Sequence, residues 1–234
     1  MKRLTSTAAL AGLAATLMVA PVAAAAPGDS GSLTVPERTQ IAVGTPLGPI
    51  GTPDMHEARP ALSIVKLYMV DYIWQHGDGT DTADLERMIK ASDDAAAQRM
   101  WDKYGPVSVS APAEAYGLTS TWPGDNWGTS YTSTADVTTF LNAKMLDPDT
   151  PILDWMRDAD AVAADGTEQN WGTSQVPGVQ GTKWGWSDYG DSEVASASFG
   201  LGFTIAANTW GFPEDQTADV LNSVNPAAVI APSA

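Results

Sequence analysis

The sequence has 234 residues, a formal net charge of −16 and no cysteine. So large an excess of acidic residues argues against nucleic acid or an anionic membrane as a partner, because both require a positive protein surface. The length suffices for one domain with its own hydrophobic core, and this core must hold the fold together without disulfide bonds.

The N-terminus predicts an export signal. Lys2 and Arg3 precede an apolar stretch of small residues, and Ala23-Ala24-Ala25 follows as a cleavage signal. The apolar stretch is too short and too rich in alanine for a good membrane span, and no later segment reaches the roughly 20 apolar residues that a span needs. Residues 1–25 are therefore expected to be a signal peptide, and the mature protein is expected to be secreted, extracellular or in the cell envelope, without a membrane span, and monomeric.

Residues 26–58 are rich in Gly, Pro, Ser and Thr and lack a sustained hydrophobic period. They are expected to form an extended N-terminal segment, with at most a short strand near Gln40–Val43. A single domain is then expected over residues 59–234, and its first part is helical. The helices expected there are Ala61 to about His76, a helix capped by Asp81 or Thr82, DDAAAQRMWDKY before Gly105, STADVTTFLNAKML from Ser133, and ILDWMRDA.

The C-terminal part changes character. VQGTKWGWSD and EVASASFGLGFTIAANTW alternate small and bulky residues around glycines, which is typical of adjacent antiparallel strands, and TADVLNSV predicts a closing helix on that sheet. Helices followed by a sheet and a last helix predict an α+β domain. The pentapeptide NWGTS occurs at Asn126–Ser130 and at Asn170–Ser174, but the flanking residues do not match, which favours two similar turns over an internal repeat.

The segment RPALSIVKLYMVDYIW, from Arg59 to Trp74, places Lys66 in an otherwise almost continuously apolar helix. A buried ammonium group must find a partner or lose its proton. Ser63 stands three residues earlier, and residues three apart share one face of a helix. A lysine kept neutral by burial could be the base that activates this hydroxyl, whereas a lysine that reaches from the helix end to water is the structural alternative.

Two later stretches, KASDDAAAQRMW and GTKWGWSD, add two further motifs in a fixed order. With SIVK in front of them, the chain resembles the penicillin-recognising serine enzymes, the family of class A β-lactamases and D-alanyl-D-alanine peptidases. The family signatures are Ser-x-x-Lys at a helix start, Ser-Asp-Asn between helices, and Lys-Thr-Gly or a relative on a strand. The counterparts here are Ser63-Ile-Val-Lys66, Ser92-Asp93-Asp94 and Lys183-Trp184-Gly185. The resemblance extends over about residues 59–224 and looks closest to a short, secreted actinobacterial branch described as serine hydrolase-like.

This resemblance implies a trimmed β-lactamase/transpeptidase-like fold and a serine acyl enzyme. Ser63 would be the nucleophile, Lys66 its base, and Ser92 would pass a proton to the leaving nitrogen. The backbone N–H groups of Ser63 and Trp186 would form the oxyanion hole. The implied ligands are D-alanyl cell-wall peptides or β-lactams, and no cofactor is expected.

The substrate side of the expected site departs from the family pattern. The resemblance implies that Lys183 holds a substrate carboxylate and that Gly185 keeps the strand wall flat. Asp94 stands where an asparagine amide usually donates to the substrate, and Trp184, in place of a small hydroxyl residue, could block the groove or act as a stacking wall. Both changes suit an altered enzyme, and both also suit an inactive member of the fold that binds envelope fragments or a protein partner.

In class A β-lactamases, a glutamate in a Glu-x-x-Leu-Asn loop is the base that hydrolyses the acyl enzyme. No such loop lies between Ser92 and Lys183. The resemblance therefore identifies no deacylation base, and poor β-lactam turnover is expected. No metal site is expected either. His56 and His76 are the only histidines, and DGTDTAD lacks the ligand spacing of a calcium loop.

Overall fold

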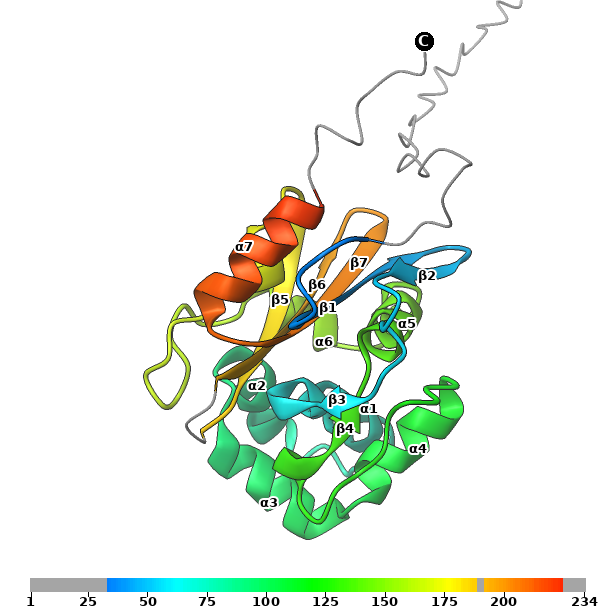
Figure 1. The fold of residues 1–234 in the computed structure, drawn as a ribbon. Helices are drawn as coiled ribbons and strands as arrows, with labels where there is room; N and C mark the ends of the chain where they lie inside the picture. Colours follow the sequence, from blue (N-terminus) through cyan, green and yellow to red (C-terminus); the bar gives the residue numbers. More distant parts are fainter. Residues whose placement is uncertain (1–32, 189–191, 225–234) are drawn as a thin grey trace, which may run out of the picture.

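The computed structural model describes residues 33–188 and 192–224. The signal peptide expected over residues 1–25 lies outside the described residues. The described part is an α+β fold in which helices flank a five-stranded antiparallel sheet (Figure 1). The α+β fold predicted from the order of the elements is therefore confirmed.

The large sheet has the strand order β2-β1-β7-β6-β5, and each neighbouring pair is antiparallel. Its strands are β1 (Thr39–Thr45), β2 (Gly48–Gly51), β5 (Val179–Trp186), β6 (Glu193–Gly200) and β7 (Phe203–Trp210). Three of these strands come from the C-terminal segments that predicted them.

The sheet begins earlier in the chain than expected. The short strand expected near Gln40–Val43 is the centre of the seven-residue strand β1, which pairs with β7 from Thr39 opposite Thr209 to Gly44 opposite Thr204. β1 and β2 thus belong to the same sheet as the C-terminal strands, so the folded unit starts before residue 59. β1 contains strand-favouring Thr, Ile and Val residues, and its pairing with β7 extends the strand beyond the short segment expected.

The helical half follows the expected order. Its helices are α1 (Val65–His76), α2 (Thr82–Lys90), α3 (Asp94–Tyr104), α4 (Val107–Ala115), α5 (Thr134–Met145) and α6 (Ile152–Arg157), and α7 (Pro213–Ser223) closes the described chain. Side-chain caps explain two starts: Asp93 accepts a bond of 2.9 Å from the Ala96 N–H, and Ser133 one of 3.2 Å from the Asp136 N–H. Gly105, at φ 65°, ends α3 as predicted. The helix α4 was not expected, because Pro112 and the adjoining serines and valines have low helix propensity.

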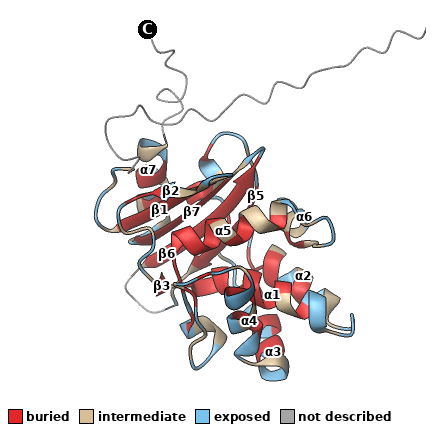
Figure 2. Ribbon diagram, turned by 90° about the vertical axis from the view of Figure 1, so that its right-hand side faces the viewer, coloured by how far each residue is buried: buried red, intermediate tan, exposed pale blue. Residues whose placement is uncertain are grey.

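Helix α1 lies at the centre of the main core, and it is red along most of its length in Figure 2, which marks buried residues. Its apolar side chains pack against the other helices and against the alanines of β6 and β7 that face them. The other face of the sheet is covered by α7, where Val220 packs with Ile41 and Ile205 (Figure 1). Burial of α1 nearly all round explains why its sequence carries almost no polar face.

The two NWGTS segments both form short 3-10 turns, at η2 (Trp127–Thr129) and η3 (Gly172–Gln175). The turn η2 contacts α1 and α3, whereas η3 contacts α7 on the other side of the sheet. The two copies therefore have similar local structure in unrelated places, as the interpretation as two turns predicted.

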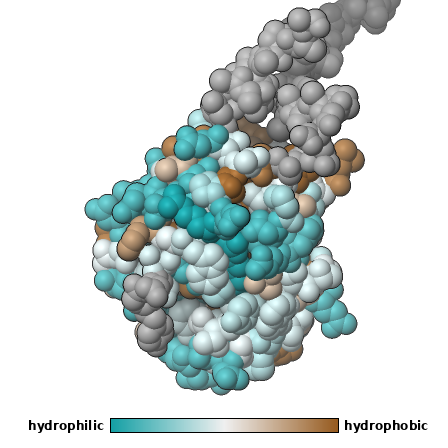
Figure 3. All heavy atoms as spheres, viewed as in Figure 1, coloured by the Kyte–Doolittle hydropathy of each residue, from teal (hydrophilic) through white to brown (hydrophobic). Residues whose placement is uncertain are grey.

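The surface is consistent with the composition. Hydrophilic residues dominate the face shown in Figure 3, in keeping with the excess of acidic side chains. In the described part of the chain, none of the helices combines the length and the hydrophobicity that crossing a bilayer requires.

Candidate active site

Four of the predicted polar residues meet where the start of α1 approaches β5 and the loop between α2 and α3. Ser63 lies in the 3-10 helix η1 (Leu62–Ile64), directly before α1, and Lys66 lies in the first turn of α1. Ser92 lies in the loop before α3, and Lys183 lies on β5. The four residues are buried, with 7 % of Ser63 exposed and none of Lys66 or Lys183.

The Lys66 ammonium group forms its hydrogen bonds with other groups of the protein. Its Nζ donates to the Ser92 carbonyl oxygen at 2.7 Å and to an Asp94 carboxylate oxygen at 2.5 Å, and it lies 3.5 Å from the Ser92 hydroxyl. The alternative of a lysine that reaches to water is therefore excluded. Burial lowers the pKa of Lys66 below its ordinary value, while the charge and the hydrogen bond of Asp94 act in the opposite direction.

Lys183 completes the network around Ser92. Its Nζ donates to the Ser92 hydroxyl at 2.7 Å and to the Trp184 carbonyl oxygen at 2.9 Å. Complete burial, together with the positive charge of Lys66, lowers the pKa of Lys183 well below its ordinary value. The oxygen atoms of Ser92 thus join two buried lysines, and a hydroxyl in that position can pass protons from one group to another.

The hydroxyl of Ser63 has no hydrogen-bond partner among residues 33–188 and 192–224. The sequence predicts that Lys66 contacts this hydroxyl, but the Lys66 ammonium is directed at Ser92 and Asp94 instead. Hydrogen bonds of catalytic groups are often absent without substrate and form only in the complex. The role of Lys66 as the base for Ser63 stays a prediction.

Two non-glycine residues at this site have left-handed backbones. Leu62 precedes the candidate nucleophile and Ser92 joins the lysines, and both have a φ of 51°. No other non-glycine residue in the described part of the chain has a positive φ. Such a conformation costs of the order of 1–3 kcal/mol per residue, and strained residues of this kind cluster at functional sites.

Gly185 lets β5 approach the turn that carries Ser63. A Cβ at Gly185 would lie 2.7 Å from the Ser63 nitrogen and 2.9 Å from the Leu62 Cβ, which is closer than such atoms can pack. The glycine is thus required by close contact between β5 and η1, a more specific reason than the flat strand wall that the sequence suggested.

The backbone N–H of Trp186 points to the free edge of β5. The Ser187 N–H donates to the Glu193 carbonyl oxygen at 3.0 Å, and Trp186 is the next residue in register, opposite Val194. In an antiparallel pair, hydrogen-bonded and non-bonded residues alternate, so the Trp186 N–H is directed away from β6. β5 is an edge strand beside Ser63, and this arrangement suits the predicted oxyanion hole of the Ser63 and Trp186 N–H groups.

The expectation that Trp184 lines or blocks a groove is wrong. Neighbouring side chains on a strand point to opposite faces, so Trp184 faces away from Lys183 and Gly185. Its indole N–H donates to the Trp171 carbonyl oxygen at 2.9 Å, and the ring packs with Trp171 and Val194. Trp184 is a core residue behind the site.

Asp94 does reach the site, in a different role from the one expected. Its carboxylate is half exposed, with 53 % of the side chain accessible, and it forms an ion pair with Lys66. It therefore neutralises a buried lysine rather than presenting an unpaired charge to a ligand.

Sequence reasoning missed two residues at the site. The ring centroid of Trp127 lies 4.6 Å from the Lys66 Nζ, and Asp165 accepts a bond of 3.0 Å from the Trp186 indole and also acts electrostatically on Lys66. Nothing local distinguishes Trp127 from the other tryptophans, because its position depends on how its loop folds back onto α1. Its place in one of the two NWGTS copies was the one available signal.

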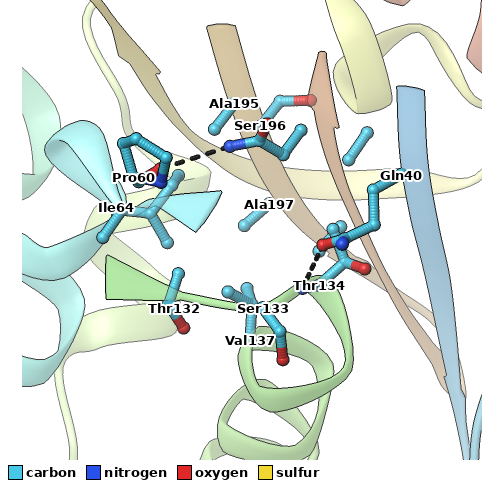
Figure 4. A pocket seen from close by; sticks show the side chains of 14 residues that line it. Gln40, Pro60, Ile64, Thr132, Ser133, Thr134, Val137, Ala195, Ser196 and Ala197 are labelled. Carbon is cyan, nitrogen blue, oxygen red and sulfur yellow. Dashed lines mark hydrogen bonds between the residues drawn. The ribbon is translucent and has the colours of Figure 1, made fainter. Parts of the chain in front are cut away.

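The turn that carries Ser63 is firmly supported from behind. Figure 4 shows the small cavity there, about 10 Å³, between Pro60 and Ile64 on one side and Ala195 and Ala197 of β6 on the other. The Asn208 side chain donates to the Pro60 carbonyl oxygen at 3.2 Å. Close packing and this bond leave η1 little freedom to move.

Among the described residues, no three His, Asp or Glu side chains are grouped so that they could hold a metal ion.

This combination of sheet, helices and site defines a class of fold: the chain has the fold of the penicillin-recognising serine enzymes. Similar solved structures include a penicillin-binding protein homologue from Mycobacterium tuberculosis, with 18 % sequence identity and a TM-score of 0.61, covering 88 % of this chain and 97 % of that chain. A β-lactamase from Sphaerobacter thermophilus has 13 % identity and a TM-score of 0.63, over 84 % and 93 % of the two chains. A D-alanyl-D-alanine carboxypeptidase from Mycobacterium tuberculosis has 17 % identity and a TM-score of 0.59, over 87 % and 96 %.

These similarities confirm the β-lactamase/transpeptidase-like fold that the three motifs predicted. No protein-family model matches the chain, and no curated protein matches its sequence. At identities below 20 %, the likeness concerns the fold, and the activity has to be argued from the site.

Proposed function

We propose that the protein is an exported serine hydrolase-like enzyme that forms an acyl enzyme on Ser63 with D-alanyl cell-wall peptides or with β-lactams. The observation that carries this proposal is the network in which Lys66 and Lys183 both bond to Ser92, with the turn that carries Ser63 packed against β5, the strand of Lys183. Two lysines are brought into a fully buried site only at a large desolvation cost, and such clusters of perturbed groups are enriched at active sites.

The proposed reaction uses each member of this network. Ser63 Oγ attacks the substrate carbonyl carbon while its proton passes to neutral Lys66, and the negative oxygen that develops accepts bonds from the Ser63 and Trp186 N–H groups. The C–N bond then breaks, and the leaving nitrogen takes the hydroxyl proton of Ser92, which is replaced from a neighbouring lysine. The products are an ester on Ser63 and a free amine.

The second step, hydrolysis of the ester, has no dedicated base in the described part of the chain. The carboxylate nearest Lys66 is Asp94, which is occupied by the ion pair, and an indole ring lies over the lysine. General base catalysis typically contributes a factor of roughly 100 to 10,000. An acyl enzyme on Ser63 should therefore be long-lived, and β-lactam turnover should be poor.

Burial of the site favours a second candidate, an inactive member of the fold that binds envelope fragments or a protein partner. Ser63 is 7 % exposed and both lysines are covered, so a substrate must open the site before it reaches the hydroxyl. This candidate predicts binding without any covalent adduct.

Intact mass spectrometry after incubation with a fluorescent penicillin tests the proposal. One adduct per chain is expected on the wild type and none on Ser63→Ala, while Ser110→Ala, a serine on the exposed side of α4, should label normally. Circular dichroism must show that Ser63→Ala is folded. Equal labelling of wild type and Ser63→Ala would remove Ser63 from the mechanism, and absence of any adduct would favour the inactive binder.

Steady-state hydrolysis of a chromogenic cephalosporin tests the long-lived ester. A turnover near about 10 per second, the median for enzymes, would show that a deacylation base exists.

A further inference from the structure

Trp127 lies against the amine of Lys66 without belonging to any of the three motifs. Its ring centroid is 4.6 Å from Nζ, and the turn η2 that carries it contacts η1, α1 and α3. A cation within about 6 Å of a tryptophan ring face is attracted by the ring, most strongly where water is excluded. Since Lys66 is completely buried, this contact acts in a water-poor environment.

The loop that carries Trp127 is built to hold the ring in place. Trp122 and Tyr131 pair through their backbones, with N–H to carbonyl distances of 3.1 and 3.0 Å, and close the loop at its base. Within it, the Asn126 N–H donates to the Thr129 hydroxyl at 3.2 Å. A Cβ at Gly124 would lie 2.2 Å from the Thr129 carbonyl oxygen, so the loop is closely packed on itself. The Trp127 side chain itself is partly buried and packs against the main core, so the indole is held in position.

Complete burial and the neighbouring Lys183 favour the neutral form of Lys66, whereas the charges of Asp93, Asp94 and Asp165 favour the charged form. Three direct contacts also favour the charged form. The Ser92 carbonyl oxygen and the Asp94 carboxylate accept hydrogen bonds from the ammonium, and the Trp127 ring face attracts the positive charge. The proposed role as a base requires the neutral amine. These contacts thus act against the neutral form of Lys66, which burial favours and which acylation needs.

We propose that Trp127 is a positioning residue for Lys66: the indole ring holds the Lys66 side chain in place and favours its charged form. The ring does not touch the reacting atoms, and it acts through Lys66. This inference rests on the proposed function of Ser63 and Lys66 for its catalytic meaning, but the effect on Lys66 itself can be measured without any reaction.

The first experiment is an NMR titration of protein labelled with ¹³C-lysine, with the Lys66 signal assigned by its loss in Lys66→Arg. Replacing Trp127 by leucine should lower the proton affinity of Lys66 about two- to fivefold, which converts to about 0.5–1 kcal/mol. Trp127→Phe should fall between wild type and leucine, because phenylalanine has a weaker ring face. Trp122→Leu, a change in the exposed tryptophan at the base of the same loop, should leave the titration unchanged.

An unchanged Lys66 titration in Trp127→Leu would overturn the inference, as would an equal effect of Trp122→Leu. If the leucine variant does not fold, the phenylalanine variant alone decides: wild-type proton affinity in that variant would contradict the inference.

The second experiment measures the rate of penicillin labelling against pH for the same variants. Trp127→Leu should label about two- to fivefold faster at pH 7, and the gain should vanish at a pH where Lys66 is neutral in both proteins. A gain of the same size at every pH would make Trp127 a steric cover only and would overturn the inference. If the wild type is never labelled while the titration shifts as expected, the proposed function fails and the influence of Trp127 on Lys66 stands.

Discussion

Replacing Asp94 by asparagine should accelerate acylation of Ser63. Asp94 accepts a bond of 2.5 Å from Lys66, and its charge opposes the fall in the Lys66 pKa that burial causes. Asparagine keeps the acceptor oxygen and removes the charge. Hydrogen bonds to charged groups contribute about 1.5–3 kcal/mol and neutral ones about 0.5–1.5 kcal/mol. Because half of the Asp94 side chain is exposed to screening solvent, we take a difference of about 1 kcal/mol, which shifts the protonation equilibrium of Lys66 about fivefold toward the neutral amine.

The assay is the initial rate of labelling by a fluorescent penicillin at pH 7, where Asp94→Asn should be about fivefold faster than the wild type. Asp102→Asn, the same change on the exposed side of α3, is the matched control and should label like the wild type. A phosphonate probe without a carboxylate separates two causes of faster labelling. Acceleration with both probes supports the effect of Asp94 on Lys66. Acceleration with penicillin alone indicates repulsion between Asp94 and the substrate carboxylate. An unchanged or slower rate with both probes would refute the reasoning.

The remaining predictions concern stability and close packing. Burial raises the pKa of Glu193 from 4.5 to about 7, so between these pH values the folded state binds a proton that the unfolded state lacks. The free energy of unfolding should therefore fall by roughly 3 kcal/mol from pH 4.5 to 7. Urea unfolding of Glu193→Gln should lack this pH dependence. Asp71→Asn should destabilise the protein by about 3 kcal/mol in the same assay, because Asp71 and Lys144 form a buried ion pair at 2.6 Å, and an unchanged midpoint would contradict this. Gly185→Ala should slow labelling roughly 100-fold by displacing β5 from Ser63, and wild-type labelling of the folded variant would show that the contact is dispensable.

Local sequence signals identified most of the helical half. The helix start near Ser133 and the stop at Gly105 are single-residue signals, and the structure places both at the helix ends that they predicted. Asp81 stands at the N-cap of α2, as one of the two caps predicted there, but its side chain makes no capping bond. The three motifs also named Lys66, Ser92 and Lys183, which hydrogen-bond to one another, whereas the predicted contact between Lys66 and the Ser63 hydroxyl is not formed in the described part of the chain.

What the sequence did not reveal depends on partners that are distant in the chain. The full length of β1 and its place in the sheet depend on pairing with β7, and Trp127 reaches Lys66 because its loop folds back over α1. The orientation of the Trp184 side chain, in contrast, could have been predicted from the local sequence. Once Lys183 is placed on a strand and directed at the site, the alternation of side chains sends its neighbour to the opposite face.

The left-handed backbones of Leu62 and Ser92 lower the stability of the folded state, but these two residues also keep the backbone of the site in one geometry. Glycine at either position would relieve the strain, yet it would also give the backbone beside Ser63 and between the lysines freedom to leave its present geometry. Selection for a more stable fold alone would favour that exchange, while selection for a serine held in one orientation would oppose it. In a descendant that no longer needed the chemistry, glycine could replace Leu62 and Ser92 without loss of function. The presence of leucine and serine at these positions is what selection for a fixed site geometry would maintain.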